Sequence, residues 1–190
     1  MTTKRSGSDS LDDIQTALVD ANVLINFVHL GQLDLLSKLK EYRFVIPEHV
    51  AVEIKRKDQA ATLKKAFQQG ILEQTAITDM KELADYAEFH KTLGQGESAC
   101  LAIAVGRGFS VASDEKGLFR RLVLRKIGLE RLLTTPDLIL TAIRSKLITV
   151  TQADKWKAKL ETHRFKMTFQ SFRGVLVIGM IPQKNFDTVR

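Results

Sequence analysis

Cysteine is nearly absent from this 190-residue chain, and several common catalytic patterns are missing altogether. The single cysteine, Cys100, excludes a disulfide framework within the chain and a zinc site built on cysteines. The four histidines are scattered without the spacing of zinc ligands. No Ser-His-Asp spacing accompanies Ser98, and the glycines of GQGES form neither a P-loop nor a dinucleotide-binding loop. These absences leave the acidic residues as the main candidates for chemistry.

Long hydrophobic runs are also missing. The first fifteen residues lack the apolar core of a signal peptide, and the longest apolar run near the C-terminus, residues 174–182, is too short to span a bilayer. We therefore expect a cytoplasmic protein with no membrane partner. Residues 1–13 are polar, and we expect them to form a disordered tail.

What the chain has in excess is positive charge. The formal net charge is +7 and the pI is about 9.6. Residues 151–190 contribute much of it, with eight Lys or Arg against three Asp or Glu. Basic charge favours binding to polyanions such as RNA or DNA, but a basic surface that only contacts solvent gives the same net charge. Charge alone leaves both interpretations open.

Apolar segments alternate with amphipathic ones along most of the chain, which predicts an α/β fold with a mainly parallel sheet. The predicted strands are residues 14–20, 44–47, 71–77, 109–113 and 129–135. The predicted helices are residues 22–30, 33–42, 48–69, 79–93, 97–105, 118–126, 136–146 and 151–164. The apolar run 174–180 is strand-like, and it is expected to add an edge strand, cover the core or contact a partner.

Four acidic residues stand beside the apolar runs. Asp20 and Asp114 each follow a predicted strand, and Glu53 and Glu97 lie in helices near that edge. Ligands of open parallel sheets bind at the carboxyl ends of the strands. A cluster of carboxylates there is tolerable only with a bound cation, and oxygen ligands suit Mg²⁺. The sequence therefore predicts a magnesium site that hydrolyses phosphodiester bonds.

Each acid also has an ordinary structural explanation. Glu97 is placed to stabilise the first turn of its helix, and Glu53 is placed to pair with Lys57 one turn further on. A single acid in such a position is more often a helix cap or a surface charge. The prediction therefore depends on all four occurring together.

Taken in order, these motifs resemble the PIN-domain family, and most closely its prokaryotic branch of VapC-type toxins. The resemblance rests on DANVLINF, on a glutamate in the helix after VIP, on GQGESACLAIA and on SDE after a strand. It covers about residues 17–146. It implies a Rossmann-like α/β/α sandwich and a metal-dependent ribonuclease, in which Asp20, Glu53, Glu97 and Asp114 bind Mg²⁺ or Mn²⁺.

The resemblance also suggests supporting residues. Asn22 matches the small polar residue that supports the first aspartate, Ser113 is a further supporting candidate, and Glu115 is a further metal-ligand candidate beside Asp114. Arginines that follow the last acid in relatives make Arg120 and Arg121 the candidates for substrate binding, although Phe119 occupies the first of the usual places.

We accordingly predict a PIN-like nuclease domain over residues 14–148 and a basic C-terminal helix and extension over 149–190. The extension has no counterpart in the resemblance, and it is expected to hold RNA, a second copy of the chain or nothing. The leading hypothesis is an endoribonuclease, with RNA as its substrate and a cognate antitoxin and a homodimer as further predicted partners. The alternatives are a non-catalytic nucleic-acid- or partner-binding protein on the same scaffold, and a nuclease that acts on DNA.

Overall fold

The centre of the molecule is a five-stranded parallel sheet with the order β3-β2-β1-β4-β5. In the computed structural model, which describes residues 14–178, every strand pair is parallel, with Ala17 opposite Phe44 on one side and Ser110 on the other. The predicted α/β fold with a parallel sheet is therefore confirmed. The strands are β1 (Gln15–Val19), β2 (Tyr42–Pro47), β3 (Glu73–Thr75), β4 (Ser110–Ala112) and β5 (Leu132–Leu133).

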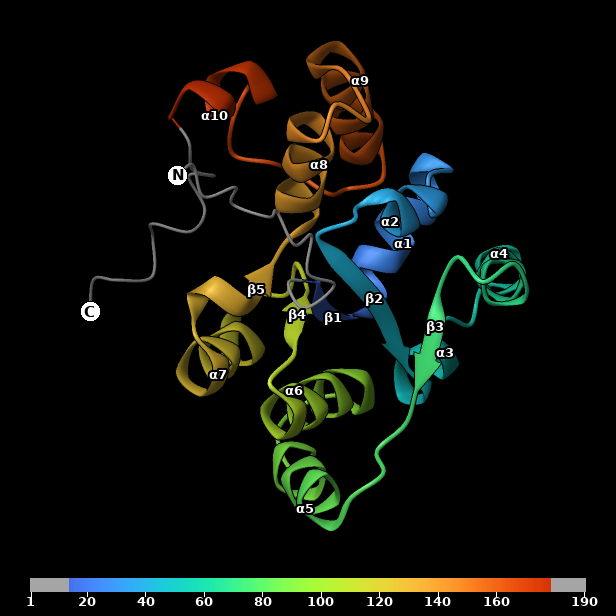
Figure 1. The fold of residues 1–190 in the computed structure, drawn as a ribbon, viewed down its shortest axis with the longest axis vertical. Helices are drawn as coiled ribbons and strands as arrows, with labels where there is room; N and C mark the ends of the chain where they lie inside the picture. The colour runs from blue at the N-terminus through green and yellow to red at the C-terminus, as the bar shows by residue number, and fades with distance from the viewer. Residues whose placement is uncertain (1–13, 179–190) are drawn as a thin grey trace, which may run out of the picture.

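Ten α-helices and a short 3-10 helix (Leu129–Arg131) surround this sheet in the described part of the chain. The α-helices are α1 (Ala21–Leu30), α2 (Asp34–Lys38), α3 (Glu48–Glu53), α4 (Lys57–Gln68), α5 (Met80–Phe89), α6 (Gln95–Arg107), α7 (Gly117–Ile127), α8 (Thr135–Arg144), α9 (Val150–Thr162) and α10 (Phe172–Ile178). Helices α8, α9 and α10 gather at one end of the long axis, and α5 and α6 gather at the other (Figure 1).

The central strands are covered on both faces, as parallel strands must be. Ala17, Leu18 and Val19 in β1 are fully buried, as are Val111 and Ala112 in β4. Helix α6 packs against β1, β2 and β4. Its small side chains allow this close approach, and residues 98–104 are buried throughout. A helix that is apolar on all sides belongs inside a core.

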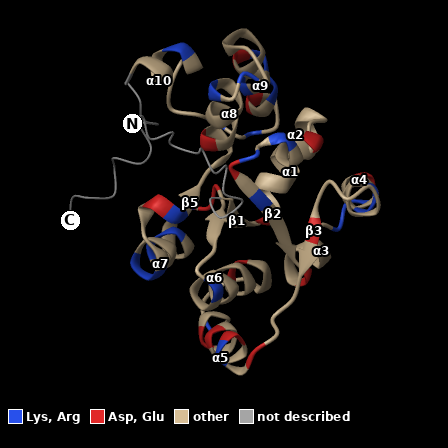
Figure 2. Ribbon diagram, in the orientation of Figure 1, with Lys and Arg blue, Asp and Glu red and all other residues tan. Residues whose placement is uncertain are grey.

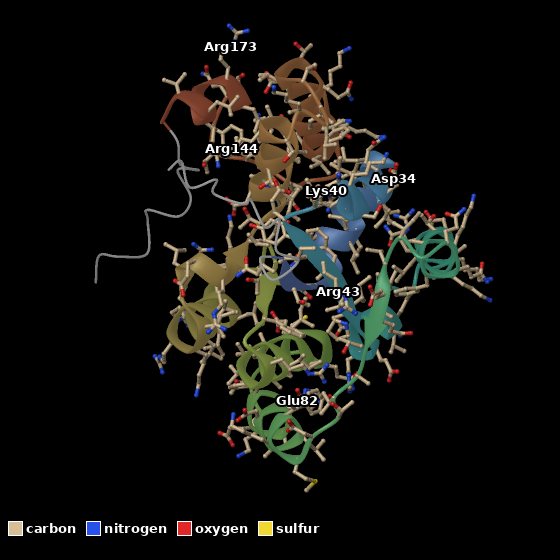
Figure 3. All side chains as sticks on the ribbon, viewed as in Figure 1. Asp34, Lys40, Arg43, Glu82, Arg144 and Arg173 are labelled. Carbon is tan, nitrogen blue, oxygen red and sulfur yellow. The ribbon has the colours of Figure 1, made fainter. Side chains whose placement is uncertain are left out.

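A buried ion pair fixes the far end of α6. The Glu82 side chain of α5 is 2% exposed and lies 2.6 Å from the Arg107 guanidinium at the end of α6. Arg107 also donates to Thr75, Thr78 and the carbonyl of Ala76. Glu82 lies where α5 meets α6 (Figure 3), so this network ties both helices to the end of β3.

The C-terminal helices continue the main core. Trp156 and Leu160 of α9 and Phe172 of α10 belong to the same buried cluster as the strands, and α9 contacts α1 and α8. No helix in residues 14–178 is long and apolar enough to cross a bilayer. The predicted tail, residues 1–13, lies outside the described residues.

Several local predictions were wrong. Only Leu132–Leu133 of the strand predicted over 129–135 is strand, because residues 129–131 form a 3-10 helix and Thr134 caps α8. The apolar run after Arg173 forms α10 rather than a strand, because Phe172 and Val175, three residues apart, bury one helical face while Val177 stays exposed. The helix predicted over 48–69 breaks between α3 and α4, where the buried Ile54 leaves helical geometry. Helix α2 ends at Lys38, well before residue 42.

Candidate metal centre at the strand switch point

The strand order reverses direction between β1 and β4. From β1 the chain adds β2 and β3 on one side, and then it crosses through α5 and α6 to place β4 on the other. This is the place where an open parallel sheet forms a crevice at its carboxyl ends. Asp20 directly follows β1, and Ser113, Asp114 and Glu115 directly follow β4.

Asp20 sits at this crevice as the N-cap of α1. Its Oδ1 accepts a hydrogen bond from the backbone N–H of Ala21 at 2.8 Å, and its Oδ2 accepts bonds from Ser113 Oγ at 2.8 Å and Asn22 Nδ2 at 2.9 Å. Only 3% of the residue is exposed. The cap and the buried bonds hold the carboxylate in one orientation.

Burial raises the pKa of Asp20 to about 7. The negative charges of Glu115 and Glu97 raise this pKa further, whereas the bonds from Ser113 and Ala21 lower it. Burial likewise raises the pKa of Glu97, and Glu115 and Glu53 add to that increase. None of the ion pairs between described residues includes Asp20, Glu53, Glu97 or Glu115. The site thus combines mutually repelling carboxylates, and among residues 14–178 no Lys, Arg or His forms an ion pair with them.

Asn22 links the two strand ends. Its Nδ2 donates to Asp20 and, at 2.9 Å, to Glu115 Oε1, while its Oδ1 accepts from the backbone N–H of Asp114 at 3.1 Å. Ser113 Oγ completes the network by accepting from the backbone N–H of Glu115 at 3.1 Å. These bonds turn the Glu115 side chain toward Asp20.

Glu53 and Glu97 meet at the start of α6. Glu97 Oε2 accepts from the backbone N–H of Gly94 at 2.9 Å and closes a capping box, and Glu53 Oε1 accepts from the backbone N–H of Gly96 at 2.8 Å. A Cβ on Gly96 would lie 2.5 Å from Glu53 Oε2. Glycine at this position therefore permits the close approach of Glu53. The buried Cys100 thiol on the next turn is within electrostatic reach of Asp20, Glu53 and Glu97, which add to the burial that raises its pKa.

Asp114 faces a different direction. Its carboxylate accepts bonds from Asn26 Nδ2 at 3.0 Å, from the backbone N–H of Thr135 at 2.8 Å and from the Thr135 hydroxyl. Burial raises the pKa of Asp114 to about 6, although these bonds lower it. Asp114 therefore joins the end of β4 to the start of α8.

The oxygen donors at this edge fit a hard divalent cation, because carboxylate, amide and hydroxyl oxygens are the ligands Mg²⁺ and Mn²⁺ accept. Within residues 14–178, however, no three Asp, Glu, His or Cys side chains are already close enough to hold a metal. The charges of Glu97 and Glu115 reach Asp20 and raise its pKa, whereas the Asp114 carboxylate is bonded to Thr135 at the start of α8. A joint ligand set of Asp20, Glu53, Glu97 and Asp114 stays a prediction.

A cavity of about 670 Å³ opens beside these acids. Arg120 lines it, whereas Arg121 is exposed outside its wall. Figure 2 shows α7 carrying several basic residues near this side of the sheet. The complete lining is Asn22, Ser113, Asp114, Glu115, Lys116, Gly117, Arg120, Thr134, Arg164, Phe165, Lys166 and Thr168.

Several of these residues were missed from the sequence. Asn26 holds Asp114 and lies one turn beyond Asn22, so a buried polar residue in an otherwise apolar helix was an available signal. The position of Thr135 at a helix start could also be predicted, because TTPD forms a capping box that begins a helix directly after a strand. Arg164 and Lys166 carried no comparable signal, since their place beside the cavity depends on tertiary packing.

The chain matches one family model and is similar to several solved structures. A family model described as "PIN domain" matches residues 16–176. No curated protein matches the chain. Among solved structures, VapBC2 from Rickettsia felis, bound to a DNA fragment from its promoter, is similar at 15% identity and a TM-score of 0.44, covering 63% of this chain and 98% of that one. PAE2754 from Pyrobaculum aerophilum is similar at 17% identity and a TM-score of 0.45, and the match covers 70% of this chain and 94% of that one.

The family match runs from within β1 to within α10 and includes the strand switch point with all the acids described above. It also includes α9, so the expectation that the segment after residue 148 has no counterpart in the family was wrong for residues 149–176. The chain belongs to the PIN-domain family.

Proposed function

We propose that this protein is a metal-dependent ribonuclease that hydrolyses phosphodiester bonds of RNA at the carboxyl edge of β1 and β4. The observation that carries the proposal is Asp20, a carboxylate that is only 3% exposed and that lies beside Glu115 through the bonds of Asn22, while no ion pair between residues 14–178 includes it. Such an arrangement is costly for a protein that needs no cation there.

In this proposal Asp20, Glu97 and Glu115 hold the cation, with Glu53 supporting it from the start of α6. A bound Mg²⁺ or Mn²⁺ supplies Lewis-acid stabilisation of the phosphodiester and a nucleophilic water at neutral pH. Asn22 and Ser113 orient Asp20 and Glu115 through the bonds described above. Asp114 acts as a positioning residue by fixing the turn that presents Ser113 and Glu115. The protein contributes mainly orientation and electrostatics, as in other phosphoryl-transfer sites.

The test is cleavage of a fluorescent single-stranded RNA with Mg²⁺ or Mn²⁺ and with EDTA. Asp20→Asn and Glu97→Gln should each lower the rate by at least about a hundredfold, the scale on which one group stabilising the transition-state charge acts. Asp34→Asn is the matched control, because Asp34 is an acid of α2 paired with Lys38 on the surface, away from the strand switch point (Figure 3). Cleavage that survives EDTA and both site substitutions contradicts the proposal.

A non-catalytic binding protein on this scaffold predicts a different outcome. RNA would bind with strong salt dependence, and no divalent cation would produce turnover. The toxin role, a cognate antitoxin, a homodimer and a cytoplasmic location stay predictions from the sequence. The antitoxin is tested by asking whether a small protein encoded beside this gene, once purified, inhibits RNA cleavage.

A further inference from the structure

One wall of the cavity beside the acids comes from the segment that follows α9, far from them in sequence. Arg164, Phe165, Lys166 and Thr168 line the same cavity as Asn22 and Glu115. The cavity is thus lined by the acids after β4 and by this basic wall of Arg164 and Lys166, with Lys116 and Arg120 adding positive charge from the turn after β4 and from α7.

The segment is held firmly against the core. The backbone N–H of Arg164 donates to Glu161 O and that of Phe165 to Leu160 O, both at 3.0 Å, in the bonding pattern of a Schellman turn. Phe165 packs against the main core and Met167 is 7% exposed. Immediately before the turn, the His163 ring stacks on His29 of α1 with 3.9 Å between centroids. The basic wall is therefore a fixed surface and not a free tail.

Arg164 also occupies a backbone position where glycine is the easier residue. Its φ is +67°, and the ends of α1 and α6 place Gly31 and Gly108 in the same left-handed region. Lys146, which follows α8, has a φ of +58° and makes the same turn, but it is exposed and lies outside the cavity lining. The two residues share a backbone conformation and a charge, and they differ in whether they face the cavity.

We infer that Arg164 and Lys166 bind the phosphates of a single-stranded RNA whose scissile bond lies over the acids, an inference that rests on the proposed function. A phosphate beside a carboxylate site needs positive charge to offset repulsion, and Arg and Lys side chains supply it. A volume of about 670 Å³ is in the range of small-ligand sites, so we assign it one or two nucleotides of a single strand. The C-terminal extension thereby becomes part of the substrate site.

The test compares Arg164→Gly with Lys146→Gly in the full-length protein. Each variant loses one positive charge at a left-handed position that glycine adopts freely, so both should keep or raise the melting temperature. Binding is measured by fluorescence anisotropy of a labelled single-stranded RNA in EDTA over a range of salt concentrations. Cleavage of the same RNA is measured with Mn²⁺, as KM and kcat.

Arg164→Gly should weaken binding and raise KM about tenfold, the loss expected for one charge-assisted contact. The slope of log K against log salt should become shallower by about 0.7, as for one lost contact to a single strand. Lys166→Ala should act in the same direction, whereas Lys146→Gly should match the wild type within about twofold, since one charge outside the cavity contributes only screened long-range attraction. A blunt RNA duplex should bind more weakly than the single strand.

The outcomes separate the two proposals. If the wild type and Arg164→Gly cleave RNA at the same rate and bind it with the same affinity and salt slope, this inference is overturned and the proposed nuclease activity stands. Wild-type protein that binds RNA through Arg164 but shows no metal-dependent cleavage overturns the proposed function alone. Equal affinity for the duplex overturns the assignment to single strands.

Discussion

Removal of divalent cations should make the stability of this protein fall as the pH rises toward neutrality, and Asp20→Asn should remove most of that fall. In the folded protein the pKa of Asp20 is raised from 3.8 to about 7 by burial. A shift of about 3 pH units corresponds to about 4 kcal/mol at about 1.36 kcal/mol per unit. Asp20 is nearly fully buried, so solvent screening reduces this value little.

The direction of this change in the free energy of unfolding follows from how many protons the folded and unfolded chains bind. Below about pH 4 both folded and unfolded chains carry the proton on Asp20, and the stabilisation is fully present. Between about pH 4 and pH 7 the unfolded chain has lost that proton and the folded chain keeps it, so each pH unit lowers the free energy of unfolding. Asp114, whose pKa is raised to about 6, contributes in the same direction between about pH 4 and pH 6.

The assay is urea unfolding in EDTA at pH 5.0 and pH 7.5. The wild type should lose at least about 3 to 4 kcal/mol across this interval, and Asp20→Asn about 2 to 3 kcal/mol less, because only the raised pKa values of Asp114 and Glu97 then remain to act in this direction. His29, whose pKa is lowered mainly by burial, acts in the opposite direction, but it is present in both proteins and cancels in their difference. Saturating Mn²⁺ should stabilise the wild type more at pH 7.5 than at pH 5.0, because the cation and the proton compete for Asp20.

A wild type and an Asp20→Asn variant with the same pH dependence in EDTA would refute this reasoning. In that case Asp20 would not be desolvated in the folded protein. Stabilisation by Mn²⁺ that is equal at both pH values would contradict the competition between cation and proton.

Three further substitutions test separate contacts. Gly96→Ala should preserve or raise the melting temperature, since alanine favours a helix by about 1 kcal/mol. The new Cβ displaces the Glu53 carboxylate, so affinity for Mn²⁺ measured by calorimetry should fall, and unchanged affinity would exclude Glu53 from the site. Thr135→Val removes a hydroxyl that donates to Asp114 and should cost about 1 to 3 kcal/mol in urea unfolding, with a lower kcat if Asp114 positions the turn. Glu82→Ala should cost about 3 kcal/mol, because it leaves a partly buried guanidinium without its acid, while kcat of the folded enzyme stays within twofold of the wild type.

The sequence predicted the fold because its signals were local. Apolar strands alternated with amphipathic helices, and Asp79 and Gly128 marked a helix start and a helix end where the structure has them. Asp20 could be placed at a strand end for the same reason, since it follows a buried run and precedes a helix. Strand β5 has only two residues, and the strand predicted over 129–135 was too long, because residues 129–131 form a 3-10 helix and Thr134 caps α8.

The geometry of the site depended on contacts that the sequence does not contain. Whether Asp114 or Glu115 faces Asp20 is decided by Asn22 and Thr135, which lie on other elements. The sequence offered Lys57 as an equally good partner for Glu53, yet Glu53 accepts a hydrogen bond from the backbone N–H of Gly96. The basic wall after α9 required the packing of α9 on α1, which no local pattern specifies.

The most direct measurement of the central claim is anomalous diffraction from crystals of the wild type soaked in Mn²⁺. We expect a peak at the carboxyl edge of β1 and β4, bound by Asp20 with Glu97 and Glu115 closing toward it, and no such peak in Asp20→Asn. Wild-type crystals that show no Mn²⁺ at this edge, from protein that still cleaves RNA in Mn²⁺, would contradict this expectation.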